Sequence, residues 1–273
     1  MPRGGLTRFA PAPTGFLHLG HVANAIWTWG TAEAIGGRVL LRIEDHDRTR
    51  SRAAYDAALL EDLAWLGFTP DHGPVRQTDP DALAAYEAAL ARLRVGGVVY
   101  GCDCTRSTFT RWRNETGRAW SGPGCPGACR GRGLDGPVLR VALGGGGEAW
   151  HDGLVGSCAG DVAGHGGDLA IRDRDGGWTY GFCVVVDDAR QGVDVVVRGR
   201  DLLEATPGQI RLARLLGRAV PPAFLHHPLI RRADGSKLSK SAADTGVRDL
   251  RANGSTPAQV LALAASALDG VVP

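Results

Sequence analysis

Short apolar strands alternate with helices through the first hundred residues, and this order limits the possible folds more than any other feature of the chain. Compact apolar segments predict strands at 6–10 and 39–43. Apolar residues at helical spacing predict helices at 22–35, 53–66 and 80–95, each of which stops at a glycine. Strands separated by helices usually run in one direction, so we expect an α/β fold built on a Rossmann-type parallel sheet.

The middle of the chain departs from this pattern, because residues 101–167 are rich in Gly, Arg and Cys. They predict an inserted subdomain with much loop and one short strand at 137–143. Further elements are then expected: a hairpin of strands 168–172 and 178–186, strands at 194–197 and 226–231, and helices at 206–216 and 257–268. The predicted organisation is a core at 1–100 and 168–241, an insertion at 101–167 and a short C-terminal helical tail at 242–273.

Composition narrows the function classes. With 44% hydrophobic and 22% charged residues the sequence is typical of a globular protein, and no apolar run approaches the roughly 18 residues needed to span a bilayer. The N-terminus MPRGGLTRFAP lacks an apolar signal core, so we expect a cytoplasmic protein without a membrane partner. We also expect a monomer. A net charge of +2 does not indicate a nucleic-acid binder, so any RNA would have to be bound by a local patch.

Four of the six cysteines form two closely spaced pairs, which are Cys102-x-Cys104 and Cys125-x3-Cys129. Thiolates at this spacing can converge on one tetrahedral zinc ion, and four sulfurs leave no position open for a substrate water. The pattern therefore predicts one structural zinc, with reactive or incidental thiols as the alternative. Cys183 lies in an apolar stretch and is expected in a buried strand, whereas no role is assigned to Cys158.

A turn followed by two histidines precedes the first predicted helix. Residues 13–15 form the turn, and His18, Gly20 and His21 stand at the N-terminal end of the helix. Backbone amides and the positive helix end attract phosphate there, Gly20 lets a flat adenine approach the backbone, and the imidazoles can donate to phosphate oxygens. The alternative is a capped turn with two exposed histidines.

A second candidate phosphate-binding segment, KLSKS at 237–241, lies far along the chain. Lys237 and Lys240 would supply mobile ammonium groups to a pentavalent phosphorus and a departing pyrophosphate. A solvated charge run is the alternative for this segment alone. Together the two segments suit a triphosphate held at both ends.

In order and context the two segments resemble the hallmark motifs of the class I aminoacyl-tRNA synthetases, usually written HIGH and KMSKS. The matching residues are HLGH at 18–21 and KLSKS at 237–241. The resemblance implies that ATP is a substrate, accompanied by magnesium. The implied catalytic residues are His18, His21, Lys237 and Lys240, and the implied ATP-binding residues are His18, Gly20, His21 and Lys240.

Three further segments resemble the amino-acid pocket of the glutamyl and glutaminyl branch of that family: RFAPA at 8–12, LRIED at 41–45 and VRGRDLL at 197–203. The implied glutamate site consists of Arg8, Ala10, Ala12, Glu44, Tyr180 and Arg198. An acidic side chain requires a fixed guanidinium, for which Arg8 is the first choice and Arg198 an additional one. Glu44 can accept from the substrate ammonium group, and Tyr180 can close the pocket. Surface arginines and a helix-capping Glu44 are the alternatives.

Over residues 6–241 the chain also resembles the glutamyl-Q tRNA(Asp) synthetases, which are stand-alone catalytic cores with a zinc site. Only 32 residues follow KLSKS, so no separate anticodon-binding domain is expected. That family holds zinc with three cysteines and a tyrosine, and Cys125 stands in the tyrosine's place, which predicts an all-thiolate site.

The resemblance implies a two-step reaction: ATP activates L-glutamate to glutamyl-adenylate, and the glutamyl group passes to queuosine in the anticodon of tRNA(Asp). Two alternatives remain open. One is a truncated glutamyl-tRNA synthetase that charges tRNA(Glu), and the other is a synthetase-like binding module without catalysis.

Arginines around the cysteine pairs, together with Trp112 and Trp120, predict a local RNA-binding patch. These arginines are Arg106, Arg111, Arg113, Arg118, Arg130 and Arg132. A solvated Arg-rich loop is the alternative.

Overall fold

The computed structural model describes residues 1–117, 124–162, 167–230 and 246–267. Within these residues seven strands form a large sheet in the order β3-β2-β1-β9-β10-β6-β7, and three form a small sheet in the order β4-β5-β8. The strands are β1 (Leu6–Phe9), β2 (Arg38–Ile43), β3 (His72–Arg76), β4 (Val99–Cys102), β5 (Val138–Val141), β6 (Gly147–Asp152), β7 (Gly156–Asp161), β8 (Leu169–Arg172), β9 (Val195–Gly199) and β10 (Ala223–His227).

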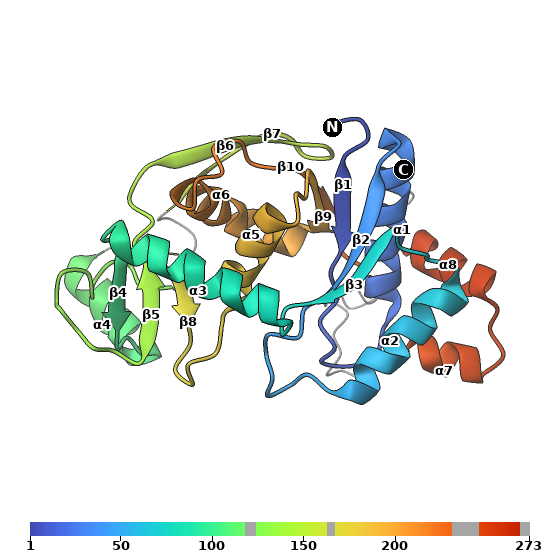
Figure 1. Ribbon diagram of the computed structural model, residues 1–273, viewed down its shortest axis with the longest axis horizontal. Coiled ribbons are helices and arrows are strands. Elements are labelled where there is room, and N and C mark those ends of the chain that lie inside the picture. Colours follow the sequence, from blue (N-terminus) through green and yellow to red (C-terminus); the bar gives the residue numbers. More distant parts are fainter. Residues whose placement is uncertain (118–123, 163–166, 231–245, 268–273) are drawn as a thin grey trace.

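Helices cover both sheets. They are α1 (Leu19–Ile35), α2 (Ala53–Leu66), α3 (Pro80–Val95), α4 (Arg106–Thr116), α5 (Tyr180–Arg190), the 3-10 helix η1 (Arg200–Ala205), α6 (Thr206–Leu215), α7 (Val247–Ala252) and α8 (Pro257–Ser266). Figure 1 shows the small sheet with α4 at one end of the molecule and α2, α7 and α8 at the other. Helices α5 and α6 lie between the two sheets.

The predicted α/β fold with a mostly parallel sheet is confirmed. Strand β1 pairs in parallel with β2 on one side and β9 on the other, and β9 continues in parallel to β10. After β1 the chain passes through α1 to β2, whereas β9 arrives from much later in the sequence. The strand order therefore reverses direction at β1, and the crevice beyond the carboxyl ends of strands at such a point is where α/β proteins bind ligands.

Residues 101–167, predicted to form an inserted unit, contribute strands to both sheets. Strands β4 and β5 pair in the small sheet, but β6 pairs in parallel with β10, and β7 follows as its antiparallel partner at the edge of the large sheet. Short strands in a glycine-rich stretch give a weak sequence signal, so this pairing was not predicted. It brings Asp152, the last residue of β6, next to the centre of the large sheet.

The predicted strand at 178–186 is wrong, because these residues enter helix α5. A tight turn does form, in which the Gly177 amide donates to Asp173 Oδ1 at 2.8 Å, but only Arg172 and Trp178 bridge across it. The apolar run from Phe182 to Val186 is buried on all sides of the helix. A short apolar run is compatible with a strand or a fully buried helix, and here tertiary packing decides. Cys183 is buried as predicted, but on a helix.

Three smaller differences concern element ends. The last predicted strand, 226–231, is β10 and ends at His227, because Pro228 follows and has no N–H for the ladder. The first helix begins at Leu19, so the histidine motif lies within the helix start. Strand β3 was missed, since its Gly-Pro sequence is unfavourable in a strand and tolerated mainly at a sheet edge.

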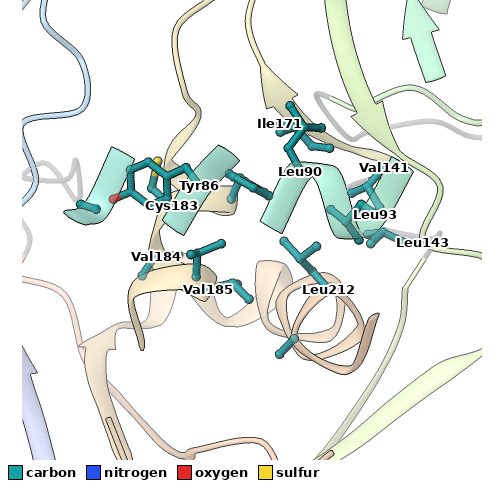
Figure 2. Packing of buried hydrophobic residues seen from close by; sticks show 14 of the residues in the cluster. Tyr86, Leu90, Leu93, Val141, Leu143, Ile171, Cys183, Val184, Val185 and Leu212 are labelled. Atoms are coloured by element: carbon teal, nitrogen blue, oxygen red, sulfur yellow. The ribbon is translucent and has the colours of Figure 1, made fainter. Parts of the chain in front are cut away.

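In the largest apolar cluster, α3, α5 and α6 pack against one another and against the small sheet. Figure 2 shows Tyr86 and Leu90 of α3, Val185 of α5, Leu212 of α6 and Ile171 of β8, which belong to one cluster of buried residues. Helix α5 is thereby fixed between the sheets. Its first residue and its polar side chains reach the carboxyl edge of the large sheet, where the candidate site lies.

In the part of the chain that the structure describes, no helix is both long and apolar enough to cross a membrane. The cytoplasmic location and the monomeric state remain predictions.

Asp62 on α2 gives a testable dependence of stability on pH. Its side chain is 3% exposed, and burial raises its pKa from 3.8 to about 6, with Arg251 opposing the shift. Between pH 3.8 and about 6 the Asp62 carboxyl group is ionised in the unfolded chain but still protonated in the folded chain. The free energy of unfolding therefore falls as the pH rises through this range. We expect Asp62→Asn to stabilise the fold by about 1–2 kcal/mol at pH 7.5 and to have no effect near pH 4, measured by urea unfolding.

Glu61→Gln is the comparison for this prediction. Glu61 is the exposed neighbour, pairs with Arg251 at the surface and adds to the rise in the Asp62 pKa, so its replacement should change stability much less than Asp62→Asn at pH 7.5. An equal gain from Asp62→Asn at both pH values would show that burial of the ionised carboxylate is not the cause.

Candidate active site

A cavity of about 540 Å³ opens at the carboxyl ends of β1 and β9, where the strand order reverses. Its wall contains every predicted ATP- and glutamate-site residue that lies within the described part of the chain. These residues are Arg8, Ala10, Ala12, His18, Gly20, His21, Glu44, Tyr180 and Arg198. Lys237 and Lys240 lie outside the described residues, so their role stays a prediction.

One end of the cavity is the start of α1. His18 is the N-cap, and its Nδ1 accepts from the Gly20 amide at 3.1 Å, while His21 Nδ1 accepts from the His18 amide at 3.1 Å. A neutral imidazole that accepts at Nδ1 carries its proton on Nε2, so both rings have Nε2–H as a donor. No acidic residue occupies the first turn to offset the helix dipole. This end is therefore suited to phosphate oxygens.

Gly20 is required by the same capping geometry. A Cβ at this position would lie 2.9 Å from Cε1 of the His18 ring, so any larger residue would displace the N-cap imidazole. The motif thus fixes both the backbone and the ring that face the cavity.

Arg8 at the other end is already held by an anion. Its Nε lies 3.2 Å from Asp188 Oδ1, and its NH1 group donates to the Val197 carbonyl at 3.0 Å. The same Asp188 oxygen accepts from Arg42 at 2.8 Å. Although burial opposes ionisation, the two guanidiniums hold the pKa of Asp188 below its usual range. Arg8 is therefore rigid, but its charge is partly neutralised.

Arg198 is buried as deeply as Arg8, yet its hydrogen-bond partners are neutral. Its Nε donates to His226 Nε2 at 3.0 Å, and its two NH2 groups donate to Gln209 Oε1 at 2.6 Å and Thr206 Oγ1 at 2.8 Å. Among the described residues no carboxylate pairs with it. Burial lowers the pKa of Arg198, with Tyr180 opposing this shift, as expected of a guanidinium without a counter-ion.

Glu44 and Tyr180 complete this end of the cavity. Glu44 Oε1 lies 3.1 Å from Arg42, and burial raises the pKa of Glu44 although Arg42 and Arg8 oppose the shift. A cation entering the cavity would favour the ionised carboxylate. Burial likewise raises the pKa of Tyr180, so its hydroxyl stays protonated and can donate a hydrogen bond.

Asn24 and His227 also line the cavity and were missed in the sequence. The Asn24 amide donates to His227 Nε2 at 2.9 Å, and His227 Nδ1 donates to the Pro228 carbonyl at 2.8 Å. Asn24 and His227 are 203 positions apart. No local pattern could have paired them, because only the sheet topology brings them together.

The four clustered cysteines converge behind the small sheet. Their sulfur atoms all lie within 4.8 Å of one another, and every one of the four residues is buried. Cys104 Sγ is 3.3 Å from Cys129 Sγ and 3.8 Å from Cys125 Sγ. Tetrahedral zinc with Zn–S bonds of about 2.3 Å spaces its sulfurs at about 3.8 Å, so the set fits one zinc ion and leaves no ligand position open.

Two arginines of the predicted RNA-binding patch form ion pairs within the protein. Arg130 donates to the buried carboxylate of Asp168, with Nε to Oδ2 at 2.5 Å, and Arg132 lies 3.3 Å from Asp103. Both arginines thus have local roles beside the cysteines. Arg111 and Arg113 lie on α4, whereas Arg118 and Trp120 fall outside the described residues. The patch stays a prediction that depends chiefly on α4.

Comparisons by sequence and by structure match this chain to the same group of proteins. The family model of the catalytic domain of class I tRNA synthetases (E and Q) matches residues 6–126 and 134–266. A protein of Symbiobacterium thermophilum named glutamyl-Q tRNA(Asp) synthetase is 41% identical, over 93% of this chain and 83% of its own. A protein of the same name from Rhodobacter capsulatus is 39% identical, over 93% of this chain and 98% of its own.

A solved structure agrees with these relatives. The glutamate tRNA ligase of Elizabethkingia meningosepticum, crystallised with its amino acid, superposes with a TM-score of 0.72 at 26% identity. The match covers 92% of this chain and 53% of the ligase, so the chain spans about half the length of that protein.

Proposed function

Because this chain belongs to the class I tRNA synthetase family of the glutamate and glutamine type, and so is a ligase, we propose that it activates L-glutamate with ATP and passes the glutamyl group to tRNA. The observation that carries the proposal is the shared cavity. A helix start suited to phosphate and a guanidinium cluster suited to carboxylates face the same space.

We assign one end of the cavity to each substrate. The triphosphate of ATP lies at His18 and His21, with magnesium as its companion ion, and L-glutamate lies between Arg198, Glu44 and Tyr180. A carboxylate oxygen of glutamate attacks the α-phosphorus, and pyrophosphate leaves. The Nε2–H groups of the two histidines donate to the phosphate oxygens as negative charge builds up on them. An acceptor hydroxyl then attacks the glutamyl carbonyl, and AMP leaves.

We propose queuosine in the anticodon of tRNA(Asp) as the acceptor. Support comes from the relatives named glutamyl-Q tRNA(Asp) synthetase, which match this chain over most of their own length. The second candidate is transfer to tRNA(Glu), favoured by the superposition on a glutamate tRNA ligase.

We further propose that the cysteine cluster holds one structural zinc ion. Cys102, Cys104, Cys125 and Cys129 would be its ligands, and the ion would fix α4 and the small sheet as a unit. With four sulfur ligands it takes no part in the chemistry of the cavity.

Two measurements test the proposal. Glutamate-dependent exchange of pyrophosphate into ATP reports activation, and transfer of labelled glutamate reports the acceptor. We expect label on queuosine-containing tRNA(Asp) and none on unmodified tRNA(Asp) or tRNA(Glu). Label on tRNA(Glu) alone would favour the second candidate, and absence of both exchange and transfer would favour a binding module without catalysis.

His21→Asn isolates the contribution of one histidine donor. The asparagine oxygen can still accept from the His18 amide, so the helix cap is kept, but the Nε2–H group is removed. We expect kcat of pyrophosphate exchange to fall about 100-fold, the usual cost of removing one donor to developing charge, with the Kd for glutamate unchanged. His72→Asn, at an exposed position on β3, is the control and should leave both values unchanged. Equal activity of the two variants would contradict the assigned role of His21.

A further inference from the structure

A buried line of hydrogen bonds crosses three adjacent strands of the large sheet and ends at Arg198. Asp152 on β6 lies 2.5 Å from His226 on β10, between Oδ2 and Nδ1. His226 Nε2 in turn lies 3.0 Å from Arg198 Nε on β9. Asp152 and His226 have no exposed surface, and Arg198 is 4% exposed. Neither Asp152 nor His226 lines the cavity, so neither touches a substrate there.

The donor chemistry of this line fixes the proton on His226. A guanidinium nitrogen can only donate, so His226 Nε2 must accept from Arg198. The ring proton is therefore on Nδ1 and is donated to Asp152. Thr206 Oγ1 is a second neighbour of His226 Nε2, at 3.2 Å, and contacts Arg198 as well.

Asp152 is ionised, as an acceptor of the His226 proton must be. Its Oδ1 accepts from the amides of Leu154 and Val155, each at 3.0 Å, and from the His226 amide at 3.3 Å. Although burial opposes it, hydrogen bonding from His226 and these amides lowers the pKa of Asp152 to about 2. Burial, reinforced by Arg198, lowers the pKa of His226 despite Asp152. The carboxylate is thus ionised and the imidazole neutral.

We propose that Asp152 and His226 are positioning residues for the recognition of glutamate. They keep a neutral acceptor behind Arg198, which fixes the guanidinium without neutralising it. A carboxylate in place of His226 would hold Arg198 equally well, but it would compete with the substrate carboxylate for the same charge. Arg8, which is paired directly with Asp188, shows that contrasting arrangement in the same cavity. The proposal rests on the proposed function, since it assumes that Arg198 binds glutamate.

Asp152→Asn tests the proton arrangement. The asparagine oxygen can keep the three backbone amides, whereas its NH2 group would face His226 Nδ1 and favour the tautomer with the proton on Nε2. That proton would point at Arg198. In 15N NMR spectra we expect the Nδ1–H tautomer of His226 in the wild type and its loss in the variant. By analogy with residues that orient metal-binding histidines, calorimetric titration should show a Kd for L-glutamate raised about 10- to 100-fold, with the KM for ATP unchanged.

A pair of changes at His226 keeps the test independent of Asp152. In His226→Gln the amide oxygen can still accept from Arg198, whereas His226→Phe keeps a ring without an acceptor. We expect the glutamine variant to retain most of the affinity for glutamate and the phenylalanine variant to lose it. Glu148→Gln is the control, because Glu148 is buried on β6 like Asp152, but among the described residues its ion pairs are with Arg211 and Arg214, away from the cavity.

The Nε2–H tautomer in the wild type would overturn the inference. An unchanged Kd for glutamate in both Asp152→Asn and His226→Phe would also overturn it. An equal loss of glutamate affinity in Glu148→Gln would do the same, because it would indicate general destabilisation. A wild-type chain that bound no glutamate would contradict the proposed function. The NMR spectrum would still decide the tautomer of His226, so the two failures can be told apart.

Discussion

Replacing Arg198 by glutamine is expected to raise the Kd for L-glutamate by about 30-fold or more. The loss of one partner from a buried, hydrogen-bonded charge pair costs about 2–5 kcal/mol, and each 1.36 kcal/mol corresponds to a factor of ten. ATP, which we propose to lie at the other end of the cavity, should bind unchanged. Calorimetric titration of each substrate measures both effects.

The physical reason is the charge balance at this end of the cavity. The guanidiniums of Arg8, Arg42 and Arg198 stand against the carboxylates of Glu44 and Asp188. With Glu44 ionised, one positive charge remains in excess. It is the charge of Arg198, whose hydrogen-bond partners are neutral. L-glutamate carries two carboxylates and one ammonium group, so its net charge is the complement. On the proposed function, this balance of charge would favour a substrate with an acidic side chain.

Two comparisons separate this effect from a loss of packing. Arg218 is also an arginine whose pKa is lowered by burial, but it donates to backbone carbonyls at Asp188 and Val193 and lies outside the cavity. Arg218→Gln should leave glutamate affinity unchanged. Arg8→Gln should weaken binding less than Arg198→Gln, because part of its charge is already neutralised. The reverse order would restore Arg8 to the main role that the sequence alone suggested.

The sequence was most informative where local chemistry fixes local structure. The helices Ala53–Leu66 and Pro80–Val95 were predicted to the residue, because apolar spacing and terminal glycines mark their ends. The place of the histidine motif at a helix start was predicted because the turn, the motif and the first apolar residues of the helix are neighbours in the sequence. The class I synthetase family and the α/β fold, both predicted from such segments, are confirmed.

The sequence was least informative where structure depends on distant partners. The sequence predicted a strand in place of helix α5 because its apolar run Phe182–Val186 is buried on all sides, and the packing against α3 and α6 that explains this burial is not visible in the sequence. Asp152 and His226 are 74 positions apart, and Asp152 lies in a glycine-rich stretch without a motif. The residues proposed to bind a substrate were therefore easier to find in the sequence than the residues that hold them in place.

Removing one thiolate from the cysteine cluster should release the proposed zinc ion. Four buried sulfurs within 4.8 Å of one another would repel strongly as thiolates without a cation, and the small cluster of residues around them supplies little other apolar packing. Structural zinc contributes about 10–16 kcal/mol of apparent binding free energy in zinc-finger peptides, so the loss of a ligand should also loosen the surrounding fold. We expect one zinc per wild-type chain and none in Cys125→Ser, measured by elemental analysis after dialysis.

Cys183→Ser is the matched control. It is the same substitution at another fully buried cysteine, which lies on α5 outside the cluster. It should keep one zinc per chain. Hydrogen exchange should become faster in β4 and α4 of Cys125→Ser, while α1 and the large sheet stay protected, because the cysteines lie in the chain segment that carries the small sheet. Full zinc content in Cys125→Ser would show that Cys125 is not a ligand. Equal zinc loss in Cys183→Ser would point to general unfolding and would leave the cluster without its assigned role.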